Sequence, residues 1–309
     1  MNETANQSSG NLVLDRRFAW AQAAAHEGAH AAAAEILEQI IAEAPRWAAA
    51  WFALGEAREK AGDHPGAILA FQHLAEADPS GLLGADLHLA RLGAGAAPAR
   101  APDAYVRGLF DTYAARFDAH LTGDLAYRAP QLLNEALRAA CERGRQIFHF
   151  PRVIDLGCGT GLMARSLFPH FDNMQGVDLS PLMIEEARRT NLYVSLHVGE
   201  LVTFLQERPA QSADLVIAAD VLVYLGALEA TFTEAARVLT SGGLFGFSVQ
   251  QGDVQDWLLG QDMRYFHSPA YLTRLAATTG FEVISLDAAS SRKDAGHDVP
   301  GLVAILRRA

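Results

Sequence analysis

The run Val153-Ile-Asp155-Leu-Gly157-Cys-Gly159-Thr-Gly161 joins a short apolar segment to a loop that contains three glycines. An apolar run followed by glycines and then by a helical pattern is typical of a buried strand that turns tightly into a helix. Several nucleotide-binding folds share such a loop, so the glycines alone do not identify the ligand. The segment therefore predicts a ligand site at the end of a strand, and the neighbouring residues have to identify its chemistry.

Two features of this loop argue against a phosphate ligand. The dinucleotide fingerprint needs glycine at position 162, where the chain has Leu162, and no P-loop pattern exists, because the only lysines are Lys60 and Lys293. Asp155 precedes the first glycine by two residues, and a carboxylate there would repel a pyrophosphate. This position suits a ligand that carries an ammonium and a sulfonium group instead.

A second acidic residue, Asp178, ends the next predicted strand, 21 residues after Gly157. In a doubly wound fold, an acid at this place accepts hydrogen bonds from both ribose hydroxyls of a nucleoside ligand. The two acids and the glycine loop together predict a nucleoside ligand without phosphate.

With these motifs in this order and spacing, residues 150–250 resemble a class I S-adenosylmethionine-dependent methyltransferase. The resemblance implies that the Gly157–Gly161 backbone approaches the methionine part of the cofactor, that Asp155 faces its amino group and that Asp178 binds the ribose. It implies that Leu179 and Met183 enclose the adenine. The full set of cofactor residues that it implies is Asp155, Gly157, Cys158, Gly159, Gly161, Asp178, Leu179, Met183, Glu200, Leu201, Ala219 and Arg128.

Several of these residues also have a simpler structural interpretation. Cys158 is expected to pack rather than to act as a nucleophile. Glu200 fits the place of an acid facing the adenine amino group, but an exposed acid at a helix start fits nearly as well. Arg128 would pair with the cofactor carboxylate, or form a surface salt bridge.

Strands and helices alternate after residue 150, which predicts an α/β fold with a mostly parallel sheet covered on both faces. The resemblance makes this a Rossmann-like, doubly wound, seven-stranded methyltransferase sheet. The expected strands are 153–156, one ending at 178, 193–198, 214–219 and 243–249, with an antiparallel pair at 281–286 and 302–306. The expected helices include 129–146, 222–240 and 268–279.

Two residues near the expected carboxyl edge of the sheet are candidates for acid–base catalysis, Tyr224 and His267. Packing of Tyr224 under a lid, and a helix-start histidine bonded to the backbone, are the alternatives. The fourth strand ends in Ala218-Ala-Asp220-Val rather than Asn/Asp-Pro-Pro-Tyr/Phe, which argues against amino-methyltransferases of nucleobases or glutamine. The aromatics Phe110, Tyr113 and Phe117 share one helix face and are expected in the core, with a lid over the site as the alternative.

The first hundred residues contain a repeat with a period of 34, and the second copy resembles a tetratricopeptide repeat. Gly55 and Ala67 would let two helices approach closely, while Gly62 makes the turn between them. The matching pairs are Gly28 and Gly62, Ala33 and Ala67, Leu37 and Phe71, and Pro45 and Pro79.

These patterns divide the chain into four expected parts: a disordered segment 1–13, an all-α tetratricopeptide-repeat domain 14–93 with a capping helix at 80–92, a linker 94–103, and a methyltransferase domain 104–309. The whole arrangement is similar to bacterial proteins that join tetratricopeptide repeats to a methyltransferase domain. That group supplies no substrate, since its acceptors are poorly defined.

Composition excludes several other classes. The 309 residues carry a net charge of −11, so nucleic acid is not an expected partner. Two cysteines rule out a disulfide scaffold and a four-cysteine zinc site, and no metal is expected, because His26 and His30 have only Glu27 as a nearby carboxylate. Neither a signal peptide nor an apolar run long enough to span a membrane is present, so no membrane partner and a cytoplasmic location are expected.

We therefore expect an S-adenosylmethionine-dependent methyltransferase whose acceptor is a small molecule or a protein, and whose repeats dock a protein or peptide partner. The alternative is a repeat scaffold whose cofactor-binding domain is catalytically silent. A nicotinamide oxidoreductase is disfavoured by Leu162 and Asp155.

Overall fold

The chain divides into two compact units, Met1–Gly108 and Leu109–Ala309, in a computed structural model that describes residues 8–113, 127–294 and 297–309. The expected boundary near residue 100 is therefore displaced to 108, within helix α6 (Asp103–Tyr113). Residues 104–108 belong with the first unit because they pack there: a Cβ on Gly84 would lie 2.9 Å from the Tyr105 ring.

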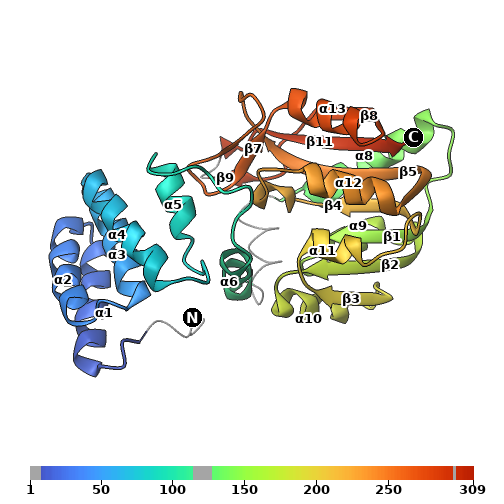
Figure 1. The fold of residues 1–309 in the computed structure, drawn as a ribbon. Helices are drawn as coiled ribbons and strands as arrows, with labels where there is room; N and C mark the ends of the chain where they lie inside the picture. Colours follow the sequence, from blue (N-terminus) through green and yellow to red (C-terminus); the bar gives the residue numbers. More distant parts are fainter. Residues whose placement is uncertain (1–7, 114–126, 295–296) are drawn as a thin grey trace. The chain divides into compact units, whose positions relative to one another are not determined.

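The first unit is helical throughout its described elements, and consecutive helices pack against one another (Figure 1). The capping helix expected at 80–92 is shorter than expected, because Gly81 and Gly84 have left-handed φ values of 69° and 65° that a helix does not accept. The helices are α1 (Leu12–His26), α2 (His30–Glu43), α3 (Ala48–Lys60), α4 (His64–Ala77) and α5 (Ala85–Arg91).

Equivalent positions of the 34-residue period have the same backbone conformation or the same burial in both copies. Gly28 and Gly62 have φ values of 82° and 84° in the turns that precede α2 and α4. Ala33 and Ala67 are both 0% exposed. The repeated residues are therefore those that form the turn and the contact between helices.

Residues 8–13 differ from the disordered segment expected at 1–13, whose first seven residues lie outside the described ones. Asn11 caps α1, because its side chain accepts a hydrogen bond from the Val13 amide. Ser8 and Ser9 both bond to the Asp15 carboxylate. These bonds satisfy the polar groups at the start of α1.

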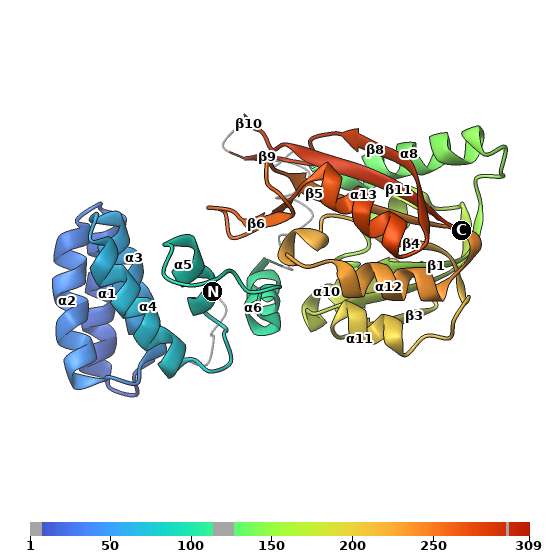
Figure 2. The ribbon, with the colours of Figure 1, turned by 45° about the horizontal axis from the view of Figure 1, so that its top comes forward.

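The second unit is built on one sheet whose main path has the order β3-β2-β1-β4-β5-β11-β8 (Figures 1 and 2). The first five strands of this path run parallel, and β11 is antiparallel to both β5 and β8, as expected for the closing pair. The path consists of β1 (Phe150–Leu156), β2 (Phe171–Asp178), β3 (Ser195–Val198), β4 (Ala213–Ala218), β5 (Leu239–Gln251), β8 (Phe281–Ala288) and β11 (Gly301–Arg308). The chain moves outward from β1 to β3 and returns to β4, so the strand order reverses between β1 and β4.

Side chains alternate across this sheet and build an apolar core on each face. In β4, Leu215 and Ile217 join the cluster under α8 and α9, whereas Val216 and Ala218 join the cluster under α11, α12 and α13. Burial on both faces explains why the strand is a continuous apolar run. The covering helices are α8 (Ala129–Arg143), α9 (Leu162–Leu167), α10 (Pro181–Arg189), α11 (Leu201–Gln206), α12 (Glu229–Val238) and α13 (Pro269–Thr278).

The segment 222–240 does not form the single helix that its apolar pattern predicted. A 3-10 turn, η2 (Leu222–Tyr224), comes first, and Leu225 is then extended, with φ −117° and ψ 125°. The helix α12 begins only at Glu229, and β5 starts at Leu239, earlier than the expected 243.

Two short strands, β6 (Trp257–Leu259) and β7 (Tyr265–His267), lie beside the end of β5, and a small hairpin joins β9 (Lys293–Asp294) to β10 (His297–Asp298). None of the helices within the described ranges has the length and apolar character that a membrane crossing requires.

Close packing at Gly55 yields a test of the first unit. A Cβ at this position would lie 2.5 Å from the Phe71 ring, which is itself fully buried. We expect Gly55→Val to lower the free energy of unfolding by about 1–3 kcal/mol, since overpacking displaces the ring. Urea denaturation followed by circular dichroism measures the change.

Gly95→Val is the matched control, because Gly95 is exposed and a Cβ there would meet nothing within 4 Å. Equal stability of the two variants would contradict the close approach of α3 and α4.

Candidate active site

The glycine loop after β1 has the backbone conformation that its glycines make possible. Gly157, Gly159 and Gly161 have φ values of 62°, 52° and 87°, in the left-handed region that glycine accepts without strain. A Cβ on Gly157 would also lie 2.4 Å from the Val221 side chain. The loop therefore brings its bare backbone close to the chain that leaves β4.

Asp178, at the end of β2, binds this loop to the start of α10. Its carboxylate accepts hydrogen bonds from the Gly159 amide and the Ser180 amide, each at 2.9 Å. Burial raises the pKa of Asp178 to about 6, against the effect of these amides. The acid predicted to hold a ribose thus lies beside the glycine loop, as the sequence suggested.

Asp155 is 1% exposed and lies in β1 below the loop. The Tyr193 hydroxyl donates to its Oδ2 at 2.7 Å, while its Oδ1 has no hydrogen-bond partner among the described residues. Burial raises the pKa of Asp155 to about 7, the Tyr193 hydrogen bond lowers it, and the Asp178 charge raises it. A buried carboxylate with a vacant oxygen suits a ligand that donates a hydrogen bond or carries a positive charge.

Two adjacent cavities lie at the carboxyl ends of β1, β2 and β4, with volumes of about 80 Å³ and 40 Å³. Tyr127, Gly157, Gly159 and Ala219 line both, Asp178 lines the larger, and Asp155 lines the smaller. Binding sites for small molecules usually enclose roughly 300–1,000 Å³, so both cavities are smaller than a typical small-molecule site. The position is the one where ligands bind in open parallel sheets.

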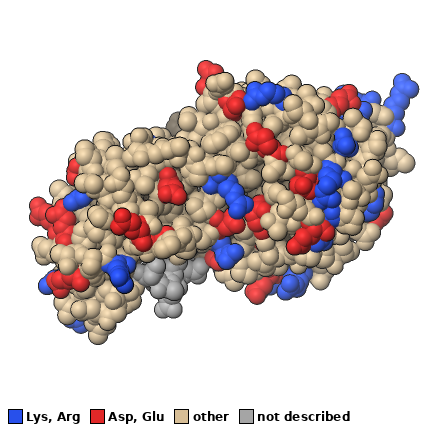
Figure 3. Space-filling model, in the orientation of Figure 1, with Lys and Arg blue, Asp and Glu red and all other residues tan. Residues whose placement is uncertain are grey.

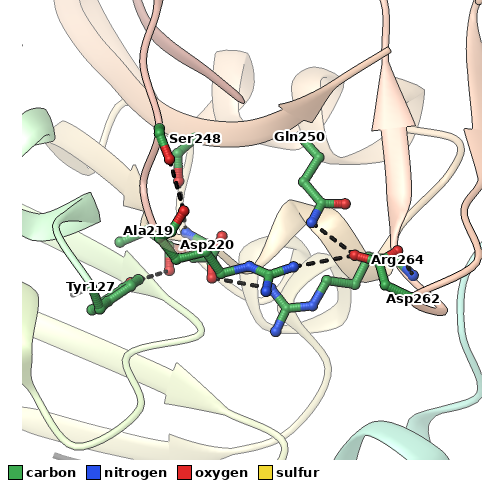
Figure 4. A network of polar contacts seen from close by, with 9 residues as sticks. Tyr127, Ala219, Asp220, Ser248, Gln250, Asp262 and Arg264 are labelled. Carbon is green, nitrogen blue, oxygen red and sulfur yellow. Dashed lines mark hydrogen bonds and ion pairs between the residues drawn. The ribbon is translucent and has the colours of Figure 1, made fainter. Parts of the chain in front are cut away.

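A polar network surrounds the larger cavity on the side of β5 (Figure 4). Asp220 follows β4 with a left-handed φ of 59°, its amide donates to Ser248 Oγ, and its carboxylate pairs with Arg264 at 3.3 Å. Asp262 accepts hydrogen bonds from Gln250 and Arg292. A non-glycine residue held in this conformation is common at functional sites.

Tyr224, one of the two catalytic candidates, lines this larger cavity. Its ring meets the Phe110 ring edge to face at a centroid distance of 5.5 Å, and the Arg264 guanidinium lies 5.4 Å from its centroid. Phe110 also lines the cavity and is only partly buried, so its place fits the lid alternative better than the expected core. Phe117 and the side chain of Tyr113 lie outside the described residues.

His267, the other catalytic candidate, is 0% exposed and is not among the described residues that line either cavity. Its Nε2 lies 3.1 Å from the Gly226 carbonyl oxygen, and burial lowers its pKa to about 4. This placement favours the alternative, a neutral histidine bonded to the backbone beside the break in the 222–240 segment.

The remaining predicted cofactor residues lie around the site at different depths. Cys158 lines the smaller cavity and packs against Ile184 and Ala187. Glu200 caps α11 by accepting from the Val202 and Thr203 amides, which is the helix-start interpretation. The described lining of the cavities does not include Leu179, Met183, Glu200, Leu201 or Arg128.

Arg128 has an exposed side chain and precedes α8, where its amide donates to the Ser291 carbonyl at 2.7 Å. The expected pairing of its guanidinium with the cofactor carboxylate stays a prediction. Met183 is 0% exposed, and contact with an adenine would require it to become accessible.

Several residues of the site were not assigned a role from the sequence, among them Tyr127, Tyr193, Val221, Asp220 and Arg264. Tyr193 and Arg264 lie far from the glycine loop in the chain, so no local spacing relates them to it. Tyr127 directly precedes Arg128, which the sequence did single out, and this was the available signal for it. No group of three or more His, Cys, Asp or Glu in the described part of the chain is placed to hold a metal ion.

Comparison with known proteins finds similarity to methyltransferases in this unit. Residues 153–243 match the family model described as "Methyltransferase domain". Among curated proteins, the ubiquinone biosynthesis O-methyltransferase of Idiomarina loihiensis is 28% identical over 113 residues, which are 35% of this chain and 46% of that protein. Human methyltransferase-like protein 27 is 37% identical over 93 residues, 30% of this chain and 36% of that protein. The chain thus spans less than half the length of each of these relatives.

Among solved structures, the fold resembles that of the Burkholderia thailandensis 1,6-didemethyltoxoflavin-N1-methyltransferase, solved with its substrate and S-adenosylhomocysteine. The TM-score is 0.52 and the identity 18%, over 70% of this chain and 93% of that one. A Leishmania major S-adenosylmethionine-dependent methyltransferase gives a TM-score of 0.50 at 17% identity, over 66% and 82% of the two chains. These structures support the Rossmann-like fold of the sheet.

The hydrogen bond between Tyr193 and Asp155 yields a test of the site electrostatics. Because the hydroxyl donates to the carboxylate, it favours the charged form and lowers the pKa. We expect Tyr193→Phe to raise the pKa of Asp155 above its present value of about 7. A carboxyl ¹³C NMR titration measures the shift.

Tyr271→Phe is the control, because the Tyr271 hydroxyl bonds to Leu228 and Glu229 instead. A pKa of Asp155 that stays the same in Tyr193→Phe, or falls, would contradict the geometry described.

Proposed function

We propose that this chain is an S-adenosylmethionine-dependent methyltransferase that acts on a small molecule. The observation that carries the proposal is the arrangement of Asp155, Asp178 and the glycine loop around two adjacent cavities, inside the segment that matches a methyltransferase domain. The O-methyltransferases among the curated relatives support a small acceptor, and a protein acceptor is the second possibility.

The residues of the site fit this cofactor. The vacant Oδ1 of Asp155 matches the ammonium of its methionine part, and the Asp178 carboxylate has lone pairs left for the ribose after binding two amides. Gly157 and Gly159 present backbone without a Cβ at the cavity wall. When bound, S-adenosylmethionine supplies an electrophilic methyl group on a sulfonium.

The protein's own contribution would be positioning and exclusion of water. In-line displacement at a methyl carbon depends on holding the nucleophile at the correct distance and angle. Phe110 and Tyr224 line the cavity and their rings are in contact, and this supports Tyr224 as the residue proposed to hold or accept a proton at its hydroxyl. His267 is not proposed for this role, because of its burial away from the cavity.

A catalytically silent domain is the alternative function, and the small volume of the cavities favours it. The two functions differ in turnover: transfer of a labelled methyl group into fractions of a cell lysate requires an active enzyme. Binding of the cofactor without any transfer would favour the silent scaffold.

We further propose that the N-terminal helices are tetratricopeptide repeats that dock a protein or peptide. A cavity of about 540 Å³ within the first unit supports this role. It is lined mainly by α1 and α3, with Phe52 contributing apolar surface and Glu56 an acid whose pKa burial raises.

A cytoplasmic location and the absence of nucleic-acid and membrane partners remain part of this proposal. The net charge of −11 supports it. On the face drawn in Figure 3, Lys and Arg are interspersed with Asp and Glu rather than gathered in one basic patch.

Asp178 is the residue whose loss should weaken cofactor binding most clearly. We expect Asp178→Ala to raise the dissociation constant of S-adenosylmethionine by roughly 10- to 100-fold, because charged hydrogen bonds to the ribose are lost. Isothermal titration calorimetry on the full chain measures it.

Asp172→Ala is the control, since Asp172 begins the same strand with an exposed side chain. Asp178→Asn keeps an acceptor oxygen for one of the two amides. Comparing it with Asp178→Ala separates the loss of cofactor binding from a collapse of the loop. Unchanged affinity in both Asp178 variants would remove the site assignment.

The docking proposal predicts a separate effect in the first unit. We expect Ala53→Arg, which introduces a long charged side chain into the cavity lining, to reduce partner capture while leaving cofactor affinity unchanged. Leu69→Arg on the exposed side of α4 should have no effect on capture. Equal capture by both variants in a pull-down would place the partner elsewhere.

A further inference from the structure

The larger cavity contains one positive charge among its described lining residues, the guanidinium of Arg264. The other charged groups of that lining are Asp178 and Asp220. Asp178 already binds two backbone amides, and Asp220 already pairs with Arg264. Both carboxylates keep acceptor capacity beside these bonds, whereas the guanidinium of Arg264 is the charged hydrogen-bond donor of this described lining.

Most donors of the Arg264 guanidinium are not used by the described part of the protein. Its Nη1 contacts Asp220 Oδ2 at 3.3 Å, which is long for a charge-assisted bond, and no other polar contact of the side chain is found there. A guanidinium has five N–H groups in a planar fork. The side chain is only 21% exposed, and Arg264 lines the larger cavity.

Asp220 is the one acid that forms an ion pair with the Arg264 side chain among the described residues. Asp262 is close, but its oxygens accept from the Gln250 amide, the Arg292 guanidinium and the Arg264 main-chain amide (Figure 4). The centroid of the Tyr224 ring lies 5.4 Å from the guanidinium carbon. A fixed cation with unused parallel donors is the arrangement that recognises a planar anion.

We propose that Arg264 binds a carboxylate of the methyl acceptor, so that the acceptor is a small carboxylic acid with an apolar or aromatic body. This inference rests on the proposed methyltransferase function and names its substrate class. Phe110 and Tyr224 line the same cavity and supply the surface for that body. Gly157 and Ala219 line it as well, so the anchored acceptor lies next to the predicted cofactor residues.

A carboxylate fits this cavity better than the two other common charged groups. An ammonium group would have to displace Arg264 from Asp220, whereas a carboxylate uses donors that are left over. A phosphate dianion would double both the attraction to Arg264 and the repulsion by Asp178 and Asp220, and the two acids outnumber the one cation of the described lining. Asp220 competes with a bound carboxylate for Arg264. Removing the negative charge of Asp220 should therefore strengthen carboxylate binding.

The probe is benzoate, compared with benzamide, benzylamine and phenyl phosphate of the same ring size. Binding is measured by ligand-observed NMR on the full chain, with and without saturating S-adenosylhomocysteine. We expect benzoate to bind at least 10-fold more tightly than benzamide or benzylamine, and more tightly than phenyl phosphate.

Variants then separate recognition from a structural role. Arg264→Gln should weaken benzoate binding about 10-fold or more, with Arg264→Lys intermediate, because lysine keeps the charge but not the fork. Asp220→Asn should tighten binding roughly 3-fold or more, since asparagine tolerates the left-handed backbone and cannot compete as an anion. A purely structural ion pair predicts weaker binding in both Arg264→Gln and Asp220→Asn.

Arg274→Gln is the matched control, because Arg274 is exposed on α13 and pairs with Asp256 away from the cavity. Binding of S-adenosylhomocysteine by each variant shows that the fold is intact. If that ligand binds and benzoate is no better than benzamide, or phenyl phosphate binds more tightly, the carboxylate inference is overturned while the proposed function stands. If S-adenosylhomocysteine does not bind the unmodified chain, the proposed function fails and the inference fails with it.

Discussion

The hydrogen bonds of one carboxylate connect the elements of the site. Asp178 ends β2, and its two oxygens bind the amides of Gly159 in the loop after β1 and of Ser180 at the start of α10. The glycines allow this contact, since their left-handed φ values bend the loop toward β2 and a Cβ at Gly157 would strike Val221. The loop after β1 and the junction between β2 and α10 are thereby fixed at one edge of the sheet, where the cavities lie.

The strand order explains why this edge gathers acids. Reversal between β1 and β4 opens a space above the carboxyl ends, so Asp155, Asp178 and Asp220 are brought to it from three different strands. Burial raises the pKa of Asp155 and of Asp178. Such a concentration of buried acids is costly unless a cation or hydrogen-bond donors compensate it. Tyr193, backbone amides and Arg264 compensate part of it, and a positively charged ligand would compensate more.

Local patterns predicted the fold where they were unambiguous. The antiparallel strands 281–286 and 302–306 lie within β8 and β11, and the glycine loop follows β1 as expected. The prediction was wrong where apolar periodicity continued across a break: residues 222–240 look helical throughout, but Leu225 is extended, and a short 3-10 turn and the helix α12 lie on either side of it. Composition also predicted the division of the chain near residue 100, whereas the structure divides it at 108, where Tyr105 packs near Gly84 in the first unit.

The sequence by itself determined the strand–loop–helix motif, the two acids that frame it and the repeated glycine and alanine positions of the first helices, because these depend on spacing along the chain. Only the tertiary structure decided which distant side chains complete the site. Tyr193 meets Asp155 across 38 positions, and Arg264 meets Asp220 across 44, and no local periodicity encodes such pairs. The fold also separated the two catalytic candidates: it placed Tyr224 on the cavity and buried His267 against the Gly226 carbonyl, since exposure to a cavity is a property of packing and not of sequence position.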